Sequence, residues 1–407
     1  MYVYVKKMEV LRTAYLMARA KRGAQGVDGV TSHQIEDSGR DAFLAEIKQS
    51  LDDASYSPGR YRKVDMPKGD GTRRTISIPT IRDRVVQGAL KLILEPIFEA
   101  DFADTSFGAR PGRNAHQAIE RVRKGLNFGK HYVVDVDLKR FFDDILHEKI
   151  LSRVARRVQD PEMLAVIKAF LKSAGKRGMP QGSPLSPLLA NLMLTDLDNA
   201  LHDAPGFLFY MYLDYIIVLA PLCAKGRLRV DKALWRIQVE SEAIGVSLNA
   251  EKTRTVCMTK AGASFDFLGF TFRWKEIPKR KKWYAHAEPK KSRVVALQRH
   301  LGMQMRRVRY LSVPNAVKLL NPMIRGWVNY FRGGNFSRVF TKVRHLVERL
   351  VRRFAARQRG RSGRGWNRWD DETVYAVWGL YRDYQIVYNY GLSKVWPPAR
   401  RIITSSS

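Results

Sequence analysis

The sequence predicts an α+β fold in which a β-rich centre is wrapped in helices. Two central segments, 132–138 and 206–220, are rich in the β-branched and aromatic residues that buried strands contain. From residue 290 onward the apolar spacing becomes helical and the chain becomes basic. A length of 407 residues suggests two or three domains, and 45% hydrophobic content is enough for their cores.

Local patterns predict the elements in chain order. A first helix places Val10, Leu11, Tyr15 and Leu16 at helical spacing, and Thr31 is expected to begin another after a Gly-rich stretch. The other predicted helices cover 38–52, 82–98 and 147–173, and the predicted hairpins cover 64–80, 206–220 and 263–274. The end of the chain is predicted to hold a basic arm, 357–368, and a compact aromatic tail, 369–396.

The charge predicts an anionic partner. There are 72 Lys and Arg residues against 39 Asp and Glu, a formal net charge of +33. Repulsion within such a surface is relieved by a polyanion, and nucleic acid is the usual one. A ribosome-associated or merely solvated basic surface is the alternative. We expect no membrane partner, because no stretch of 18 apolar residues lacks a charge.

Cysteine usage favours a reducing compartment. Two cysteines, Cys223 and Cys257, are too few for a disulfide framework or a zinc ribbon. Residues 1–23 lack the long apolar stretch of a secretory signal. We therefore expect a bacterial-type cytoplasmic protein, with an Arg-rich organellar presequence as the alternative.

Three acidic residues lie where strands normally have apolar side chains. Asp214 is the only charge between Phe207 and Ala220, and a carboxylate there costs several kcal/mol unless it is paired or binds a metal. Asp135 and Asp137, at i and i+2, share one face of their strand. Alone, Asp214 would be a turn residue and Asp135 a salt-bridge partner. Together, two such strands side by side predict an oxygen-ligand site for Mg²⁺.

The segments around these carboxylates resemble the palm of the reverse transcriptase family, of the group II intron type. DVDLKRFFDDI (135–145) resembles its first palm motif, and YLDY (212–215) lies where the family has Tyr-x-Asp-Asp. GMPQGSPLSPLLANLML (178–194), LNAEKT (248–253) and FDFLGFTF (265–272) resemble the PQG motif, the motif that follows and the primer-grip region. The resemblance implies two Mg²⁺ ions, replaceable by Mn²⁺, held by Asp137, Asp214 and the backbone oxygen of Leu138.

Other family roles follow residue by residue. The resemblance implies that Phe142 screens the sugar 2′-hydroxyl and that Lys252 protonates pyrophosphate. Gln181 and Gly182 would line the nucleotide and template pocket. Residues 66–113 resemble the group II fingers, so Lys68 and Arg74 would hold the incoming triphosphate; Arg offers phosphate a planar fork of donors.

The resemblance covers residues 11 to about 335, on both sides of the palm motifs. KRGAQGVDGVT (21–31) resembles the group II N-terminal extension, and LNPMIRGWVNYFR (320–332) resembles the maturase or thumb motif. It implies a right-hand polymerase with fingers, a mainly antiparallel palm and a helical thumb. The expected domains are an N-terminal extension (1–62), fingers and palm (63–285), a thumb or maturase region (286–350), and a basic arm with an aromatic tail (351–407). An HNH-type nuclease with paired cysteines is not expected.

The expected function is RNA-directed DNA synthesis together with maturation of intron RNA. The partners would be intron and template RNA, a DNA primer or target, and dNTPs. The chain departs from the family at Tyr215, which replaces the second aspartate, and at Leu213 and Ala109. Losing a carboxylate should lower metal affinity and turnover. The alternatives are therefore a splicing maturase with impaired polymerase, or a reverse transcriptase adopted by a host for phage defence or beside a CRISPR system.

Overall fold

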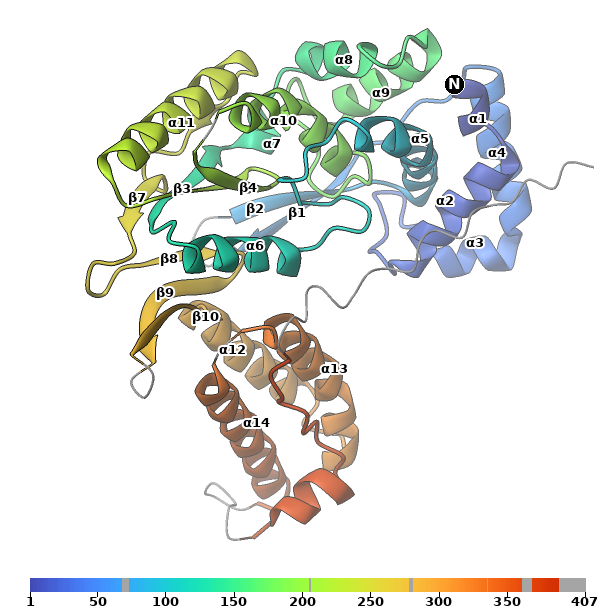
Figure 1. Ribbon diagram of the computed structural model, residues 1–407. Helices are drawn as coiled ribbons and strands as arrows, with labels where there is room; N and C mark the ends of the chain where they lie inside the picture. Colours follow the sequence, from blue (N-terminus) through green and yellow to red (C-terminus); the bar gives the residue numbers. More distant parts are fainter. Residues whose placement is uncertain (68–72, 205, 278–280, 335, 361–367, 388–407) are drawn as a thin grey trace, which may run out of the picture. The chain divides into compact units, whose positions relative to one another are not determined.

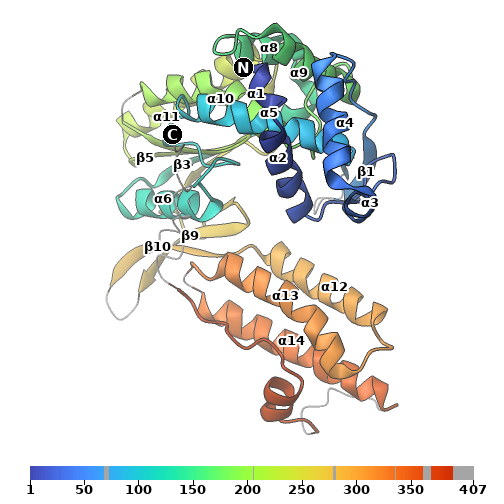
Figure 2. The ribbon, with the colours of Figure 1, turned by 90° about the vertical axis from the view of Figure 1, so that its right-hand side faces the viewer.

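The computed structural model describes residues 1–67, 73–204, 206–277, 281–334, 336–360 and 368–387. The chain divides into two compact units, which are described separately below. The first contains residues 1–114 and 132–255, and the second contains residues 115–131 and 256–407 (Figures 1 and 2). The predicted triphosphate ligand Lys68 lies outside the described residues.

The first unit begins with helices that surround the long helix α5. These are α1 (Tyr2–Val5), α2 (Met8–Ala20), α3 (Ser32–Ser38), α4 (Arg40–Asp52) and α5 (Ile81–Glu99). Thr31 begins α3 as predicted, through a capping box with Gln34. Gly88 lets α2 and α5 approach closely, because a β-carbon there would lie 3.1 Å from Cβ of Ala14. The predicted hairpin is the antiparallel pair β1 (Arg62–Pro67) and β2 (Arg73–Ile78).

A mainly antiparallel sheet forms the centre of this unit. Its strands are β3 (Tyr132–Lys139), β4 (Leu208–Tyr212), β5 (Tyr215–Ala220) and β6 (Ser247–Leu248), in the order β4-β5-β3-β6, and β7 (Arg254–Cys257) also pairs with β3. Its helices are α7 (Phe141–Asp144), α8 (His147–Ala155), α9 (Pro161–Ala174), α10 (Ser186–His202) and α11 (Ala224–Ala243). Helix α11 packs on β3, β5 and β6 and also contacts α10.

Side chains of β3 alternate between two environments. Val134, Val136 and Leu138 belong to the main hydrophobic core, whereas Asp135 and Asp137 alternate with them on the opposite face. The helical region predicted over 147–173 is two helices. Asp160 caps the second by accepting a hydrogen bond from the backbone of Met163, and Pro161 supplies its first residue.

The second unit joins a small sheet to a helical bundle. It contains α6 (Ala115–Asn127), β8 (Ser264–Phe267), β9 (Phe270–Ile277), β10 (Lys282–Pro289), α12 (Lys291–Arg307), α13 (Val313–Phe331), α14 (Ser337–Gln358) and a π-helical turn, Thr373–Val377. The strands are antiparallel in the order β10-β9-β8, and α6 packs on β10. Helices α12, α13 and α14 contact one another.

Residues 368–387 fold back onto this bundle. The buried Arg352 donates to Asp371 at 2.7 Å, and Arg332 donates to Asp383 at 2.8 Å. The predicted aromatic tail is therefore part of the unit as far as residue 387. Across the described residues, we find no helix long and apolar enough to cross a membrane.

Candidate active site

The β3–β5 strand pair brings the predicted carboxylates together. Asp137 of β3 lies opposite Tyr215 of β5, and Asp135 lies opposite Ile217. Asp214 occupies the two-residue turn between β4 and β5, and its carbonyl accepts a hydrogen bond from the backbone of Leu138 at 3.3 Å. Antiparallel pairing thus places the turn at the end of β3 that carries Asp137.

The turn is tight and closely supported. Leu213 has a positive φ of 55°, a conformation that costs a non-glycine residue about 1 kcal/mol or more. Gly108 packs directly beneath it, because a β-carbon at Gly108 would lie 2.6 Å from the backbone nitrogen of Leu213. The Gly108 carbonyl accepts a hydrogen bond from the buried Asn191 side chain at 2.8 Å. The segment predicted as part of the fingers therefore fixes the position of the Asp214 turn.

Asp137 has two side-chain partners. Lys252 Nζ lies 3.2 Å from its Oδ2, and Asn249 Nδ2 donates to the same oxygen at 3.2 Å. The backbone of Asn249 also donates to the Asp137 carbonyl at 2.8 Å. The structure thus brings Lys252 to the carboxylates, as the resemblance implied, and it adds Asn249, which sequence reasoning did not single out.

The carboxyl group of Asp214 has a raised pKa. Burial and the negative charge of Asp137 raise its pKa to about 6, against the opposing effects of Arg74 and Lys252. Two carboxylates that repel each other favour a cation between them. Since Arg74 of β2 lowers the pKa of Asp214, the predicted triphosphate ligand also lies within electrostatic reach of the turn.

Asp135 differs from Asp137 and Asp214 in its hydrogen-bond partners. It is 3% exposed, and Arg254 Nε donates to its Oδ2 at 3.2 Å. The phenol of Tyr215 also hydrogen-bonds to it. Burial raises the pKa of Tyr215, and the Asp135 charge and this hydrogen bond raise it further, so the phenol stays neutral. Asp135 is therefore a salt-bridge partner, which was one of the two interpretations of its sequence position.

The PQG segment is attached to the second strand of the β1–β2 hairpin. The backbone of Ser77 donates to the Gln181 carbonyl at 2.7 Å. Gly182 has φ of +122°, and a β-carbon there would lie 2.6 Å from the Ser77 carbonyl, so only glycine fits. The buried Gln87 accepts a hydrogen bond from Ser183 at 2.5 Å, which ties α5 to the same segment.

Phe142 is half-buried at the start of α7. Its ring meets that of the buried Phe141 edge-on, with 5.4 Å between centroids. The Phe142 carbonyl accepts a hydrogen bond from the backbone of Met179 at 2.6 Å, and Gln181 donates to Asp143 at 3.4 Å. The predicted sugar-contacting residue is therefore joined to the PQG segment, and part of its ring stays accessible.

The donor set suits magnesium better than a structural metal. Within the described part of the chain, no group of three or more His, Cys, Asp and Glu side chains is placed to hold a metal ion. Mg²⁺ is usually held by one or two carboxylates together with waters and substrate phosphates. Asp137 and Asp214, with repulsion that a cation would relieve, fit that requirement.

Two family models match the chain. Residues 66–272 match the model described as reverse transcriptase (RNA-dependent DNA polymerase). This chain belongs to the reverse transcriptase family. Residues 294–371 match the group II intron, maturase-specific domain, which confirms the group II intron type. The reverse transcriptase match spans the palm sheet, the Asp214 turn and the segments attached to it, and it confirms the expected right-hand class.

Curated proteins from bacteria and from yeast are similar to about half of this chain. The chain is 34% identical over 218 residues to Protein YkfC of Escherichia coli, covering 49% of this chain and 56% of that protein. It is 32% identical over 213 residues to the group II intron-encoded protein LtrA of Lactococcus lactis, covering 49% and 34%. A putative COX1/OXI3 intron 1 protein of Saccharomyces cerevisiae is 29% identical, covering 49% and 25%. The chain thus aligns with about half or less of each relative.

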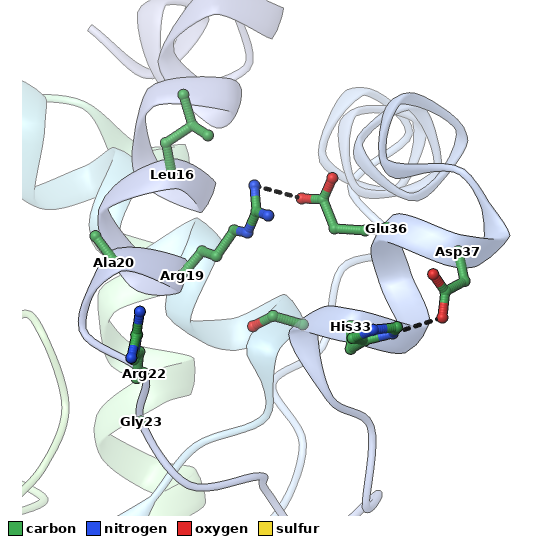
Figure 3. A pocket seen from close by; sticks show the side chains of 9 residues that line it. Leu16, Arg19, Ala20, Arg22, Gly23, His33, Glu36 and Asp37 are labelled. Atoms are coloured by element: carbon green, nitrogen blue, oxygen red, sulfur yellow. Dashed lines mark hydrogen bonds and ion pairs between the residues drawn. The ribbon is translucent and has the colours of Figure 1, made fainter.

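A separate pocket of about 780 Å³ lies between α2 and α3 (Figure 3). Four of its polar side chains pair with each other. Arg19 lies 3.2 Å from Glu36, and His33 lies 2.6 Å from Asp37. None of the predicted site residues lines this pocket, so its size does not make it the active site.

Proposed function

We propose that this reverse transcriptase synthesises DNA on an RNA template at Asp137 and Asp214. The observation that carries the proposal is the β3–β5 pairing, which sets these two carboxylates together at one turn. Divalent cations held between them would activate a primer 3′ hydroxyl and stabilise the pyrophosphate leaving group. The backbone oxygen of Leu138 is proposed as a further ligand.

The surrounding residues are proposed to bind and orient the nucleotide. Arg74 would hold the triphosphate of a dNTP, as would Lys68. Lys252, which lies beside Asp137, would give its proton to the departing pyrophosphate. Gln181 and Gly182 would position the base pair between template and nucleotide, and Phe142 would exclude the 2′-hydroxyl of a ribonucleotide.

We further propose that the polymerase is slow because Tyr215 replaces a carboxylate. The phenol stays neutral and is engaged with Asp135, so it adds no charge to hold a cation. The site would then need a high concentration of Mg²⁺, and Mn²⁺ would support more activity because it binds oxygen ligands more tightly.

RNA binding is proposed as the second function. The maturase-specific match over 294–371 and the net charge of +33 support binding of a group II intron RNA. Binding stabilises a folded RNA without chemistry, so it does not depend on Tyr215. The proposed partners are therefore intron RNA, template RNA, a DNA primer or target, and dNTPs.

Primer extension tests the polymerase proposal directly. Purified protein, an RNA template, a labelled DNA primer and dNTPs are incubated over titrations of Mg²⁺ and Mn²⁺. We expect slow, dNTP-dependent extension that is greater with Mn²⁺, and none with an Asp137→Ala variant. No extension with either metal, while RNA binding is retained, would leave the chain as an RNA-binding maturase without polymerase activity.

A further inference from the structure

Three aromatic rings lie in a row at the β9–β10 ribbon of the second unit, and two of them are stacked. The ring centroids of His131 and Trp274 are 4.3 Å apart, and the two ring planes are tilted by 52°. Those of Trp274 and Trp283 are 6.5 Å apart, with planes only 14° from parallel. The side chain of Trp283 ends the stack and is 51% exposed. Trp283 is thus exposed to solvent while its ring is already stacked on that of Trp274.

Backbone pairing between β9 and β10 holds the stacked rings of Trp274 and Trp283 in place. Trp274 lies opposite Ala285, and Trp283 lies opposite Glu276, so both tryptophans share one face of a ribbon paired over eight residues. Asn127 at the end of α6 accepts a hydrogen bond from the backbone of Ala285 at 2.8 Å. Binding against such a surface loses little conformational entropy, because the rings are already ordered.

The ribbon around Trp283 is basic. Lys281 and Lys282 are exposed immediately before it, whereas Lys275 of the paired strand lies on the other face of the ribbon. The acid next to the ring is Glu276, which is exposed. Arg273 and Glu288, further along the ribbon, form an ion pair with each other. A negatively charged ligand is therefore favoured at the Trp283 end.

We propose that Trp283 is a stacking platform for an unpaired RNA base, with Lys281 and Lys282 contacting the neighbouring phosphates. The inference rests on the proposed RNA binding, and it specifies which part of an RNA binds to this ribbon. Aromatic side chains stack on bases that a single strand exposes, whereas a duplex hides its bases within the helix. The ligand is thus a single-stranded loop or end, recognised by its ring faces and without regard to sequence.

The test compares two exposed tryptophans on two RNA substrates. Trp283→Ala should weaken binding of a single-stranded RNA oligonucleotide by about tenfold and leave binding of a blunt RNA duplex unchanged. Trp283→Phe keeps a ring and should retain most of the affinity. Trp235→Ala is the matched control, because Trp235 on α11 is 63% exposed but has no comparable ring stack among the described residues.

Salt dependence separates stacking from charge. Trp283→Ala should lower the affinity at every salt concentration without changing the slope of log K against log[salt]. Changing both Lys281 and Lys282 to Ala should reduce that slope by roughly 1 to 2. Equal losses for single strand and duplex, or a Trp283→Ala affinity matching that of the Trp235→Ala control, would overturn the inference. Wild-type protein that binds no RNA would overturn the proposed RNA-binding function as well.

Discussion

The phenol of Tyr215 hydrogen-bonds to the carboxylate of Asp135. Tyr215 lies directly opposite Asp137 on the neighbouring strand, yet its ring reaches diagonally to Asp135, two residues earlier. Asp135 is also paired with Arg254, so its charge is compensated without a metal. Tyr215 therefore completes a hydrogen-bonded cluster beside the Asp137–Asp214 pair, and it occupies the position where its family has a second aspartate.

Tyr215→Asp should raise polymerase activity and lower the Mg²⁺ concentration that it requires. A carboxylate beside Asp214 would add negative charge to the field that holds divalent cations. RNA affinity should not rise, and any splicing assistance should be unaffected. The measurement is primer extension over a Mg²⁺ titration. Tyr215→Phe is the control, because it removes the hydrogen bond to Asp135 without adding charge, and it should not gain activity. A wild type already as fast as Tyr215→Asp at low Mg²⁺ would show that the second carboxylate is dispensable here.

Asp137→Ala should abolish DNA synthesis while RNA affinity stays within a factor of about two. The change removes one of two mutually repelling carboxylates, so unfolding free energy should alter by no more than about 1 kcal/mol. Primer extension, RNA binding and thermal unfolding measure the three effects. Asp135→Asn provides a comparison, because it disturbs the Arg254 pair but should leave measurable synthesis. Equal activity of wild type and Asp137→Ala would remove Asp137 from the site.

Phe142→Ala should let ribonucleotides compete with deoxyribonucleotides. The gain would come from losing a steric clash, so use of dNTPs should change less than use of rNTPs. The adjacent Phe141 is 1% exposed and serves as the control. Phe141→Ala should cost about 3–5 kcal/mol of stability without altering sugar discrimination. Unchanged exclusion of rNTPs by an active Phe142→Ala enzyme would make Phe142 a packing residue.

Asp198→Asn should stabilise the protein at neutral pH. Burial raises the pKa of Asp198 to about 6, although Thr105 donates to it at 2.9 Å. Its folded pKa exceeds the unfolded value of about 4, so its ionisation lowers stability as pH rises from about 4 to 6. Removing that penalty should add up to about 3 kcal/mol at pH 7 and nothing below pH 4. Thermal unfolding across this range is the measurement. Asp196→Asn, on the exposed side of the same helix, should give no such gain.

RNA affinity should fall steeply with salt. A chain carrying a net charge of +33 binds a polyanion largely through released counterions, so log K should decrease linearly with log[salt]. Arg306, Arg307 and Arg309 are exposed at the end of α12, inside the maturase-specific match. Changing all three to Gln should reduce the slope by about 2 if they contact phosphates. A nearly flat salt response of the wild type would contradict a phosphate-dominated interface.

Much of the fold could be predicted because its strands and helices have strong local patterns. The period-2 placement of Asp135 and Asp137 predicted one shared strand face, and the apolar stretch around Asp214 predicted the hairpin that turns there. Helices α10 and α11 were not predicted as separate elements. The first begins at Ser186, within the PQG motif, where two prolines and a glycine at 180–184 interrupt the helical pattern.

The contacts that decide roles could not be predicted, since they join residues far apart in sequence. Asn249 reaches Asp137 across 112 residues, and Arg254 reaches Asp135 across 119. The sequence left open whether Asp135 was a metal ligand or a salt-bridge partner. The structure distinguishes the two aspartates by their partners, because Lys252 and Asn249 contact Asp137 whereas Arg254 contacts Asp135. The resemblance to the family predicted Asp137 as the metal ligand, whereas the local sequence pattern did not distinguish it from Asp135.

The hydrogen bond from Ser77 to Gln181 joins the strand that carries Arg74 to the PQG segment. A triphosphate that pulls on Arg74 would displace β2, and this bond would carry the displacement directly to Gln181. Gly182 lies against the carbonyl of Ser77, so the two segments are in direct contact at a second point. If Arg74 binds the triphosphate and Gln181 the template, as proposed, this contact would couple nucleotide binding to template alignment.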